Sequence, residues 1–431
     1  MKILGFKDEF VKQTGLVFFG LGVFTLFSLL YHFFMLRSLL PTDYGHLNTL
    51  IALHMMISVP AGMIQTTITK FISSFKLENQ HDHAIELLRH FLLLVSIIAL
   101  SFFLLITFAS SHISSFLQIS SPGSVILFGL SLTFSLVMTV PMGGLQGLQE
   151  FRPLAFNYIV NGGLKFALGV LFVLLGWGVL GALGAMAISC FVTAFLSFTM
   201  LISCMRNGKE LLHAEPNHEG VKGFSVSEVY LYFFPVGTVL LCFTVLTNVD
   251  VILVKHFFPP IEAGYYSIAQ MVGKIILFLP FPVVTVMFPK LFSSGDQEKK
   301  KLFILGKSLM MAGILCCGAI MLGLLFPASI IRILSGKFYV ECIPLVRLFC
   351  VNMTFFSLIL ILLNYHLSTQ KRGFLFPLVF FTLIEIGLIL LFHDTLVQVL
   401  LAMGIVAFCL SVINFYLVYH LYKCKRKEGF V

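Results

Sequence analysis

Long hydrophobic runs separated by short polar stretches dominate this chain. Each run is about 20 residues long, the length at which an α-helix crosses the roughly 30 Å hydrocarbon core of a bilayer. Six runs precede a polar stretch, at approximately 14–36, 46–69, 87–108, 122–146, 154–176 and 178–203. Six more follow it, at approximately 229–256, 263–289, 302–327, 343–367, 374–393 and 396–422. The pattern therefore predicts an all-α polytopic membrane protein with twelve transmembrane helices.

The chain also repeats itself weakly at about half its length. Arg37, Pro41, Gly45, Pro60 and Lys70 recur as Lys255, Pro259, Gly264, Pro280 and Lys290. Parallel repeats of this kind are typical of two-lobed transporters, and six spans per copy give both copies the same orientation. We expect two six-helix lobes related by a pseudo-two-fold axis along the membrane normal. The predicted domains are an N-terminal lobe at 1–203, a cytoplasmic linker at 204–227 and a C-terminal lobe at 228–431.

Composition and charge agree with a membrane protein. Of 431 residues, 58% are hydrophobic and 11% charged, with a mean hydropathy of +1.00, which excludes a soluble globule. Most of the 28 Lys and Arg residues fall on one side if the N-terminus is cytoplasmic, as the positive-inside rule requires. The net charge of +9 then needs no nucleic-acid partner. We predict a multi-pass protein of the cell membrane with both termini cytoplasmic.

Metal and disulfide chemistry have little support. The nine cysteines lie mostly in or beside apolar runs, without the spacing of a metal site or disulfide framework. His81, Asp82, His83 and His90 resemble a metal site only superficially, because they lie in and beside a polar loop. We predict no metal and no cofactor.

Three segments resemble a known family. They are 250–290, with Glu262-Ala263-Gly264-Tyr265-Tyr266-Ser267-Ile268-Ala269 at its centre, Arg37 to Leu47, and Gly144 to Phe151. The chain resembles the polysaccharide-export and oligosaccharide-flippase branch of the multidrug/oligosaccharidyl-lipid/polysaccharide exporter superfamily. The resemblance implies two lobes around a central cavity that opens alternately to each face. It implies a lipid-linked oligosaccharide as cargo, with membrane lipids and other polysaccharide-assembly proteins as candidate partners.

Ionisable residues inside the spans are the candidate functional groups, because each costs at least about 2.5 to 3.5 kcal/mol to insert. The repeat places them in matched pairs: His32 with Asp250, His54 with Lys274, and Lys165 with Glu385. In an axis-related fold, matched positions lie on opposite walls of one cavity. We therefore expect these six residues to line the central cavity.

We expect cationic and acidic members to have different roles. Lys165 and Lys274, helped by Arg37 and Lys255 at the outer mouth, would attract the pyrophosphate of the cargo. Charge balance, or uptake of a coupling proton or sodium ion, would fall to Asp250, Glu385, His32 and His54. The alternatives are a structural Lys165–Glu385 ion pair, histidines that only pack, and end-of-span cations that snorkel to the interface.

Prolines at matched places within spans two and eight predict backbone irregularities. Pro60 and Pro280 each remove a hydrogen-bond donor and are expected to kink their helices. Such kinks could act as hinges for the lobes or could shape the cavity without moving.

Three functions remain open. The first is a flippase that moves a lipid-linked oligosaccharide from the cytoplasmic to the outer leaflet by alternating access. The second is a multidrug or metabolite exporter of the same fold, driven by an ion gradient. The third, a polysaccharide polymerase or glycosyltransferase, is disfavoured because the short outer loops hold no acidic pair arranged for sugar chemistry. Without a nucleotide-binding loop, ATP hydrolysis is not expected.

Overall fold

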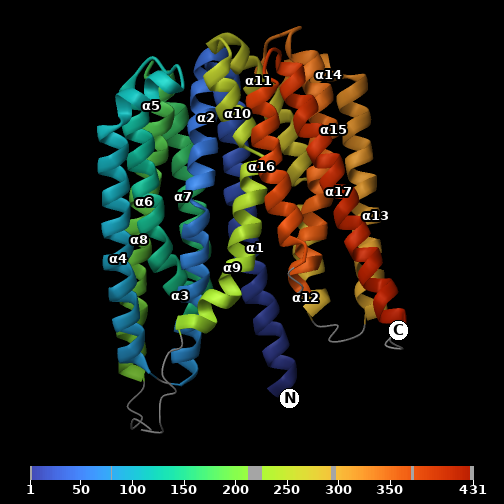
Figure 1. Cartoon of the computed structure of the whole chain (residues 1–431). Helices are drawn as coiled ribbons and strands as arrows, with labels where there is room; N and C mark the ends of the chain where they lie inside the picture. Colours follow the sequence, from blue (N-terminus) through green and yellow to red (C-terminus); the bar gives the residue numbers. More distant parts are fainter. Residues whose placement is uncertain (1, 79, 212–225, 293–297, 370–372, 428–431) are drawn as a thin grey trace. The chain divides into compact units, whose positions relative to one another are not determined.

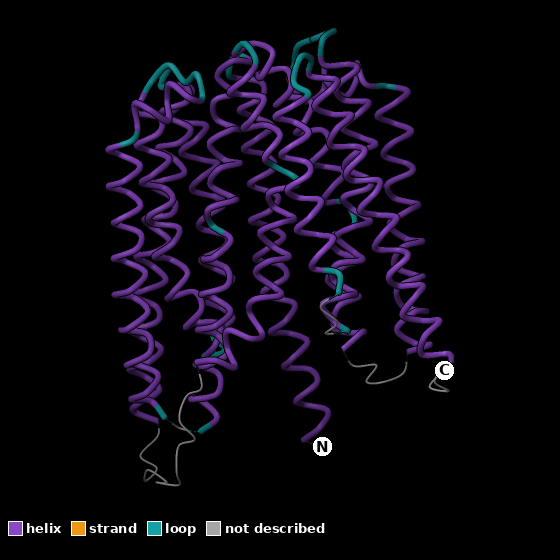
Figure 2. Tube along the Cα trace, viewed as in Figure 1, coloured by secondary structure: helices purple, strands orange, loops and turns teal. Residues whose placement is uncertain are grey.

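The computed structural model describes residues 2–78, 80–211, 226–292, 298–369 and 373–427. Throughout these ranges every regular element is an α-helix (Figure 2). The predicted linker at 204–227 falls largely outside the described residues, which resume at the start of α9 (Val226–Leu246). The all-α class expected from the hydrophobic pattern is confirmed.

Eleven segments of the described chain are long and apolar enough to cross a membrane. A further apolar helix, α16 (Leu375–Leu391), has 17 residues and extends roughly 26 Å at 1.5 Å per residue. Large apolar side chains are exposed along these helices, including Ile97, Leu105 and Phe108 on α4 (His81–Phe108), as expected of surfaces that face lipid. The protein is therefore a multi-pass membrane protein whose segments match the twelve predicted spans.

The helices form two compact units. The first contains residues 1–39 and 57–230, and the second contains residues 40–56 and 231–431. Unit 1 holds α1 (Lys2–Ser38), α3 (Val59–Leu77), α4, α5 (Ser110–Phe116), α6 (Pro122–Gly147), α7 (Phe151–Leu174) and α8 (Gly178–Leu211). Unit 2 holds most of α9, and also α2 (Pro41–Ile57), α10 (Val249–Phe257), α11 (Pro260–Phe278), α12 (Phe281–Phe292), α13 (Glu298–Leu325), α14 (Pro327–Ser335), α15 (Cys342–Ser368), α16 and α17 (Leu396–Lys427) (Figure 1).

Helix α2 belongs to unit 2, although the repeat assigns it to the N-terminal lobe. The reason lies in the matched glycines of the two copies, Gly45 on α2 and Gly264 on α11. A Cβ added to Gly45 would lie 3.1 Å from the Gly264 Cα, and one added to Gly264 would collide with the Pro41 carbonyl oxygen. The two backbones therefore touch, which only residues without a side chain permit.

Both prolines predicted to kink a span lie at a helix break. In span two, α2 ends at Ile57 and α3 begins at Val59, so that Pro60 lies in the first turn of α3. In span eight, α11 ends at Phe278 and α12 begins at Phe281, with Pro280 between them. The break in span two coincides with the passage of the chain from unit 2 to unit 1. A hinge role for either proline stays a prediction.

Close packing of α1 along α7 builds one side of unit 1. A Cβ on Gly20 would lie 2.8 Å from the Ala155 Cα, and a Cβ on Gly162 would lie 3.1 Å from the Phe24 Cα. Since both residue numbers rise together along the seam, the two helices run parallel. Small residues thus let the backbones approach, as in other membrane helix pairs.

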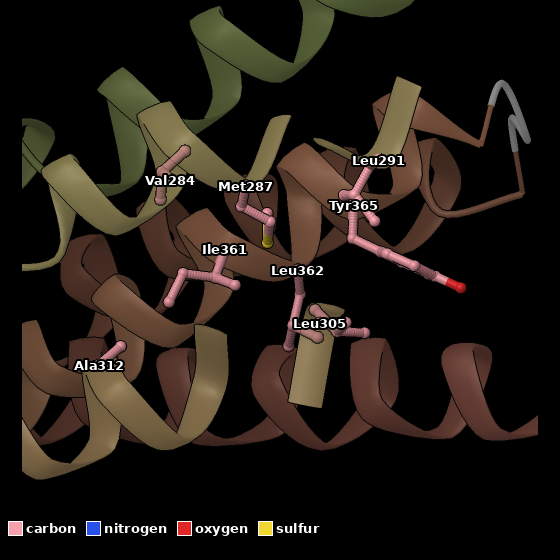
Figure 3. Close-up of a cluster of buried hydrophobic side chains, with 8 residues drawn as sticks. All are labelled: Val284, Met287, Leu291, Leu305, Ala312, Ile361, Leu362 and Tyr365. Atoms are coloured by element: carbon pink, nitrogen blue, oxygen red, sulfur yellow. The ribbon is translucent and has the colours of Figure 1, made fainter. Parts of the chain in front are cut away.

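A cluster of buried apolar side chains holds α12, α13 and α15 together in unit 2 (Figure 3). Its members are Val284, Met287, Leu291, Leu305, Ala312, Ile361, Leu362 and Tyr365. Helices α12 and α15 contribute residues three or four positions apart and α13 contributes residues seven apart, and both are spacings of one helix face. The cluster gives this part of unit 2 a packed interior.

Candidate functional site

A buried carboxyl group, Asp250, is the centre of a hydrogen-bond network in unit 2. Tyr266 Oη donates to Asp250 Oδ2 at 2.8 Å, and Gln270 Nε2 lies 3.1 and 3.2 Å from Oδ1 and Oδ2. All three side chains are completely buried. Hydrogen bonds in such surroundings are strong, and their loss is costly because no water can replace them.

Local structure explains why these groups meet. The chain breaks between α9 and α10 at Thr247 and Asn248, so that Asp250 falls in the first turn of α10, where the helix dipole favours a negative charge. On α11, Tyr266 and Gln270 are four residues apart and therefore share one face. The break between α9 and α10 thus places the Asp250 carboxyl group against the face of α11 that carries Tyr266 and Gln270.

Gln270 links the carboxyl group to α2. Its Nε2 donates to Asp250, while its Oε1 accepts a hydrogen bond of 2.8 Å from Asn48 Nδ2. Both ends of the amide are thus engaged, and the amide orientation is fixed by its two neighbours. Asn48 is buried on α2, three residues beyond the glycine contact with α11.

Lys274 lies one turn beyond Gln270 on the same face of α11. Its Nζ donates to Asn248 Oδ1 at 2.9 Å, and Asn248 Nδ2 in turn donates to the Thr244 carbonyl oxygen at 2.8 Å. The lysine is half-buried, unlike Asp250 and Gln270. Its ammonium group therefore lies close to the break before α10.

The second buried acid, Glu385 on α16, differs from Asp250 in having no hydrogen-bond partner among the described residues. Neither carboxylate oxygen accepts a hydrogen bond within the described residues, although the side chain is fully buried. Helices α10 and α16 are in contact, and the carboxyl groups of Glu385 and Asp250 are within electrostatic range of each other. A carboxylate without donors in such a place needs a proton or a cation.

In unit 1, Lys165 lies against an aromatic ring. Its Nζ is 4.7 Å from the centre of the Tyr31 ring, and the Tyr31 hydroxyl donates to the Ala182 carbonyl oxygen at 3.0 Å. Gly169 makes room for the ring, because a Cβ there would lie 2.7 Å from Tyr31 Cε2. Lys165 is half-buried, and no described residue accepts a hydrogen bond from its ammonium group.

The two cations expected at the outer mouth have different surroundings. Arg37 is exposed, with its guanidinium carbon 4.4 Å from the centre of the Phe33 ring. Lys255 is completely buried in unit 2, and its Nζ has no hydrogen-bond partner in the part of the chain that is described. Because it is exposed, Arg37 could extend its guanidinium group to the membrane interface, whereas the buried Lys255 could not.

The three residue pairs matched by the repeat differ in whether their two members lie in one unit or in two. His54 and Lys274 both belong to unit 2, whereas His32 and Lys165 belong to unit 1 and their counterparts to unit 2. His32 lies edge-on to the neighbouring Tyr31 ring at 5.7 Å, and both histidines are half-buried. Lys165 and Glu385 belong to different units, and the alternative of a structural ion pair between them stays a prediction.

Sequence reasoning missed Tyr266, Gln270 and Asn48 as members of the site. A signal was present, because positions 266, 270 and 274 repeat every four residues on one helix face. No group of three or more His, Cys, Asp or Glu side chains arranged to hold a metal occurs among the described residues.

Known proteins of similar fold are transporters. An inward-facing multidrug resistance MATE family transporter of the MOP superfamily matches with a TM-score of 0.76 and 14% identity, over 95% of this chain and 99% of that one. Lipid II flippase MurJ in an inward closed conformation matches with a TM-score of 0.70 and 13% identity, over 95% and 87%. The eukaryotic MATE transporter AtDTX14 gives 0.61 and 14%, over 98% and 100%. At these identities the likeness establishes the fold.

Family membership rests on a sequence match. A search of curated proteins finds no match to the chain. The profile of a family described as polysaccharide biosynthesis protein, however, matches residues 10–295, about two thirds of the chain and all of the segments from Arg37 to Pro289 that carry the resemblance. The chain therefore belongs to the polysaccharide biosynthesis protein family, with the fold of the MOP superfamily.

Proposed function

We propose that this protein is a flippase that moves a lipid-linked oligosaccharide from the cytoplasmic to the outer leaflet by alternating access. The observation that carries the proposal is Lys165, a cation in a membrane-spanning helix whose ammonium group lies over a tyrosine ring and has no acceptor among the described residues. A charge at this depth costs at least about 2.5 to 3.5 kcal/mol. Hydrogen bonds to a pyrophosphate would offset that cost.

Further cations would complete the binding of the head group. Lys274 is half-buried and already held by Asn248, so it can exchange one acceptor for another. Lys255 is buried without an acceptor, and Arg37 is exposed at the end of α1. The family description and the fold shared with lipid II flippase MurJ support an anionic glycolipid as the cargo.

Coupling to an ion would involve the acidic groups. Asp250 has its oxygens occupied by Tyr266 and Gln270, whereas Glu385 has both oxygens free of donors. A proton or sodium ion would therefore be taken up at Glu385, with Asp250 as the neighbouring charge. His32 and His54 are the remaining ionisable candidates.

The proposed orientation has both termini in the cytoplasm of the cell membrane. It rests on the basic residues, which the positive-inside rule places on the cytoplasmic side. Tags fused to each terminus should both resist protease added to intact cells and become cleavable when the membrane is permeabilised. A tag that is cut in intact cells contradicts the orientation.

Deletion of the gene provides the direct test. We expect glycosylated pyrophosphate lipids to accumulate in the deletion strain, detected by mass spectrometry of extracted lipids. Lys165→Ala and Lys274→Ala should each fail to reverse the accumulation at equal expression. Lys307→Ala, an exposed lysine on α13, is the matched control and should restore the wild-type lipid pool. An unchanged pool in the deletion strain rejects the proposal.

An exporter of cationic drugs or metabolites is the second candidate. It is favoured by the unpartnered Glu385 carboxylate, which could bind a cation, and by the fold shared with MATE transporters. This function predicts that deletion raises sensitivity to cationic compounds and leaves lipid-linked sugars unchanged. Glu385→Gln should reproduce that sensitivity.

A further inference from the structure

A second polar cluster lies in unit 1, where α3, α6 and α7 meet. Gln65 Nε2 donates to Gln146 Oε1 at 3.2 Å, and Thr69 Oγ1 reaches the same oxygen at 3.4 Å. The Tyr158 side chain from α7 lies close to that of Gln65. All four side chains are half-buried within membrane-spanning segments. None of them takes part in the pyrophosphate binding or ion coupling proposed above.

Helix packing does not require this cluster. The crossing of α3 and α6 is already made by Gly143 and Gly147, since a Cβ on Gly143 would lie 2.8 Å from the Gln65 carbonyl oxygen. Gln146 Oε1 accepts a hydrogen bond from Gln65 Nε2, whereas Gln146 Nε2 donates to no described residue. An amide donor that is taken out of water without gaining an acceptor is unfavourable by roughly 1 to 3 kcal/mol on mutational scales. The free donors therefore indicate a polar occupant.

Tyr158, the α7 member of the cluster, lies on the same face of α7 as Lys165. Tyr158 packs against Phe24, with ring centres 6.3 Å apart, and Lys165 packs against Tyr31. Phe24 and Tyr31 are seven residues apart on α1, and Tyr158 and Lys165 are seven residues apart on the parallel helix α7. Two turns of helix separate Tyr158 from Lys165 by about 10 Å, the span of one or two sugar rings.

We propose that Gln65, Gln146 and Tyr158 form a glycan subsite for the sugars next to the pyrophosphate. The inference rests on the proposed function and extends it from head-group charge to sugar recognition. Carboxamides and a phenol donate and accept hydrogen bonds, as hydroxyl and acetamido groups require, and carry no charge that would compete with the lysine. The proposal thereby gives a role to Gln146, which lies in the segment Gly144 to Phe151 that carries the family resemblance.

Native mass spectrometry of the purified full-length protein can separate the two contributions. The probes are farnesyl pyrophosphate, which has no sugar, and the acidic lipid extract of the source cells, which contains their own glycosylated pyrophosphate lipids. We expect Gln146→Met and Tyr158→Phe to retain glycosylated lipids about 10-fold less than wild type, the effect of one or two hydrogen bonds. Farnesyl pyrophosphate should be retained within twofold of wild type, which also shows that the variants are folded.

Three controls decide the outcome. Lys165→Ala should lose both probes, Gln146→Asn should recover part of the glycolipid binding, and Thr66→Val on the exposed side of α3 should behave as wild type. Equal loss of both probes, or loss of neither, in Gln146→Met overturns the glycan subsite. Failure of the wild-type protein to retain any pyrophosphate lipid overturns the flippase proposal itself.

Discussion

Removal of one hydroxyl group tests the Asp250 network. Tyr266→Phe deletes the donor that lies 2.8 Å from Asp250 Oδ2 and keeps the ring, which packs edge-on against Phe349 with centres 4.9 Å apart. Because the ring keeps its volume, no cavity forms. A hydrogen bond to a charged group contributes about 1.5 to 3 kcal/mol, whereas one to a neutral group contributes about 0.5 to 1.5 kcal/mol. With Gln270 as the remaining donor to that oxygen, we expect the free energy of unfolding to fall by about 1.5 to 3 kcal/mol.

Reversible unfolding of the purified protein in mixed micelles measures this change. Tyr416→Phe, at a tyrosine on α17 that is 60% exposed, is the matched control and should alter stability by less than about 0.5 kcal/mol. A loss near 0.5 to 1 kcal/mol would show that Asp250 is protonated in the purified state. A loss no greater than that of the control would refute a buried network centred on Asp250.

Three further substitutions have defined expected effects on stability. Gly147→Ala should destabilise the protein by about 1 to 3 kcal/mol, because its Cβ would lie 2.6 Å from the Ile72 Cβ; wild-type thermal stability would contradict the close α3–α6 contact. Gln149→Gly should stabilise it by about 0.5 to 1 kcal/mol, since Gln149 has a φ of 60° at the end of α6, and an unfolding titration checks this. Lys255→Met should raise the free energy of unfolding by at least about 1 kcal/mol by removing a buried unpaired cation, while export falls; intact export would remove this lysine from the proposed binding site.

Much of the fold could be predicted from hydrophobic runs and the repeat. Pro60 and Pro280 marked the helix breaks because a proline cannot donate to the preceding turn, whatever surrounds it. Lys165 and Lys274 stood out because a cation in a span is costly and rare. Both arguments depend only on local chemistry, so they needed no knowledge of how helices pack.

What could not be predicted depends on helix neighbours. The hydrophobic pattern of α2 is the same whichever helices cover it, so neither its place in unit 2 nor the bond from Asn48 to Gln270 follows from the sequence. The burial of Lys255 was missed for the same reason, since the end of a span can be covered by a neighbour or left open.

The exchange of α2 between units has a consequence for biosynthesis. The glycine partner of α2 on α11 lies 219 residues later in the chain, from Gly45 to Gly264. At about 5 to 20 residues per second, the ribosome needs roughly 10 to 45 s to produce it. During that interval α2 lies in the bilayer without its final neighbour, so unit 2 cannot complete its packing until α11 has been made. Two halves expressed as separate chains should consequently be stable only when they are synthesised together.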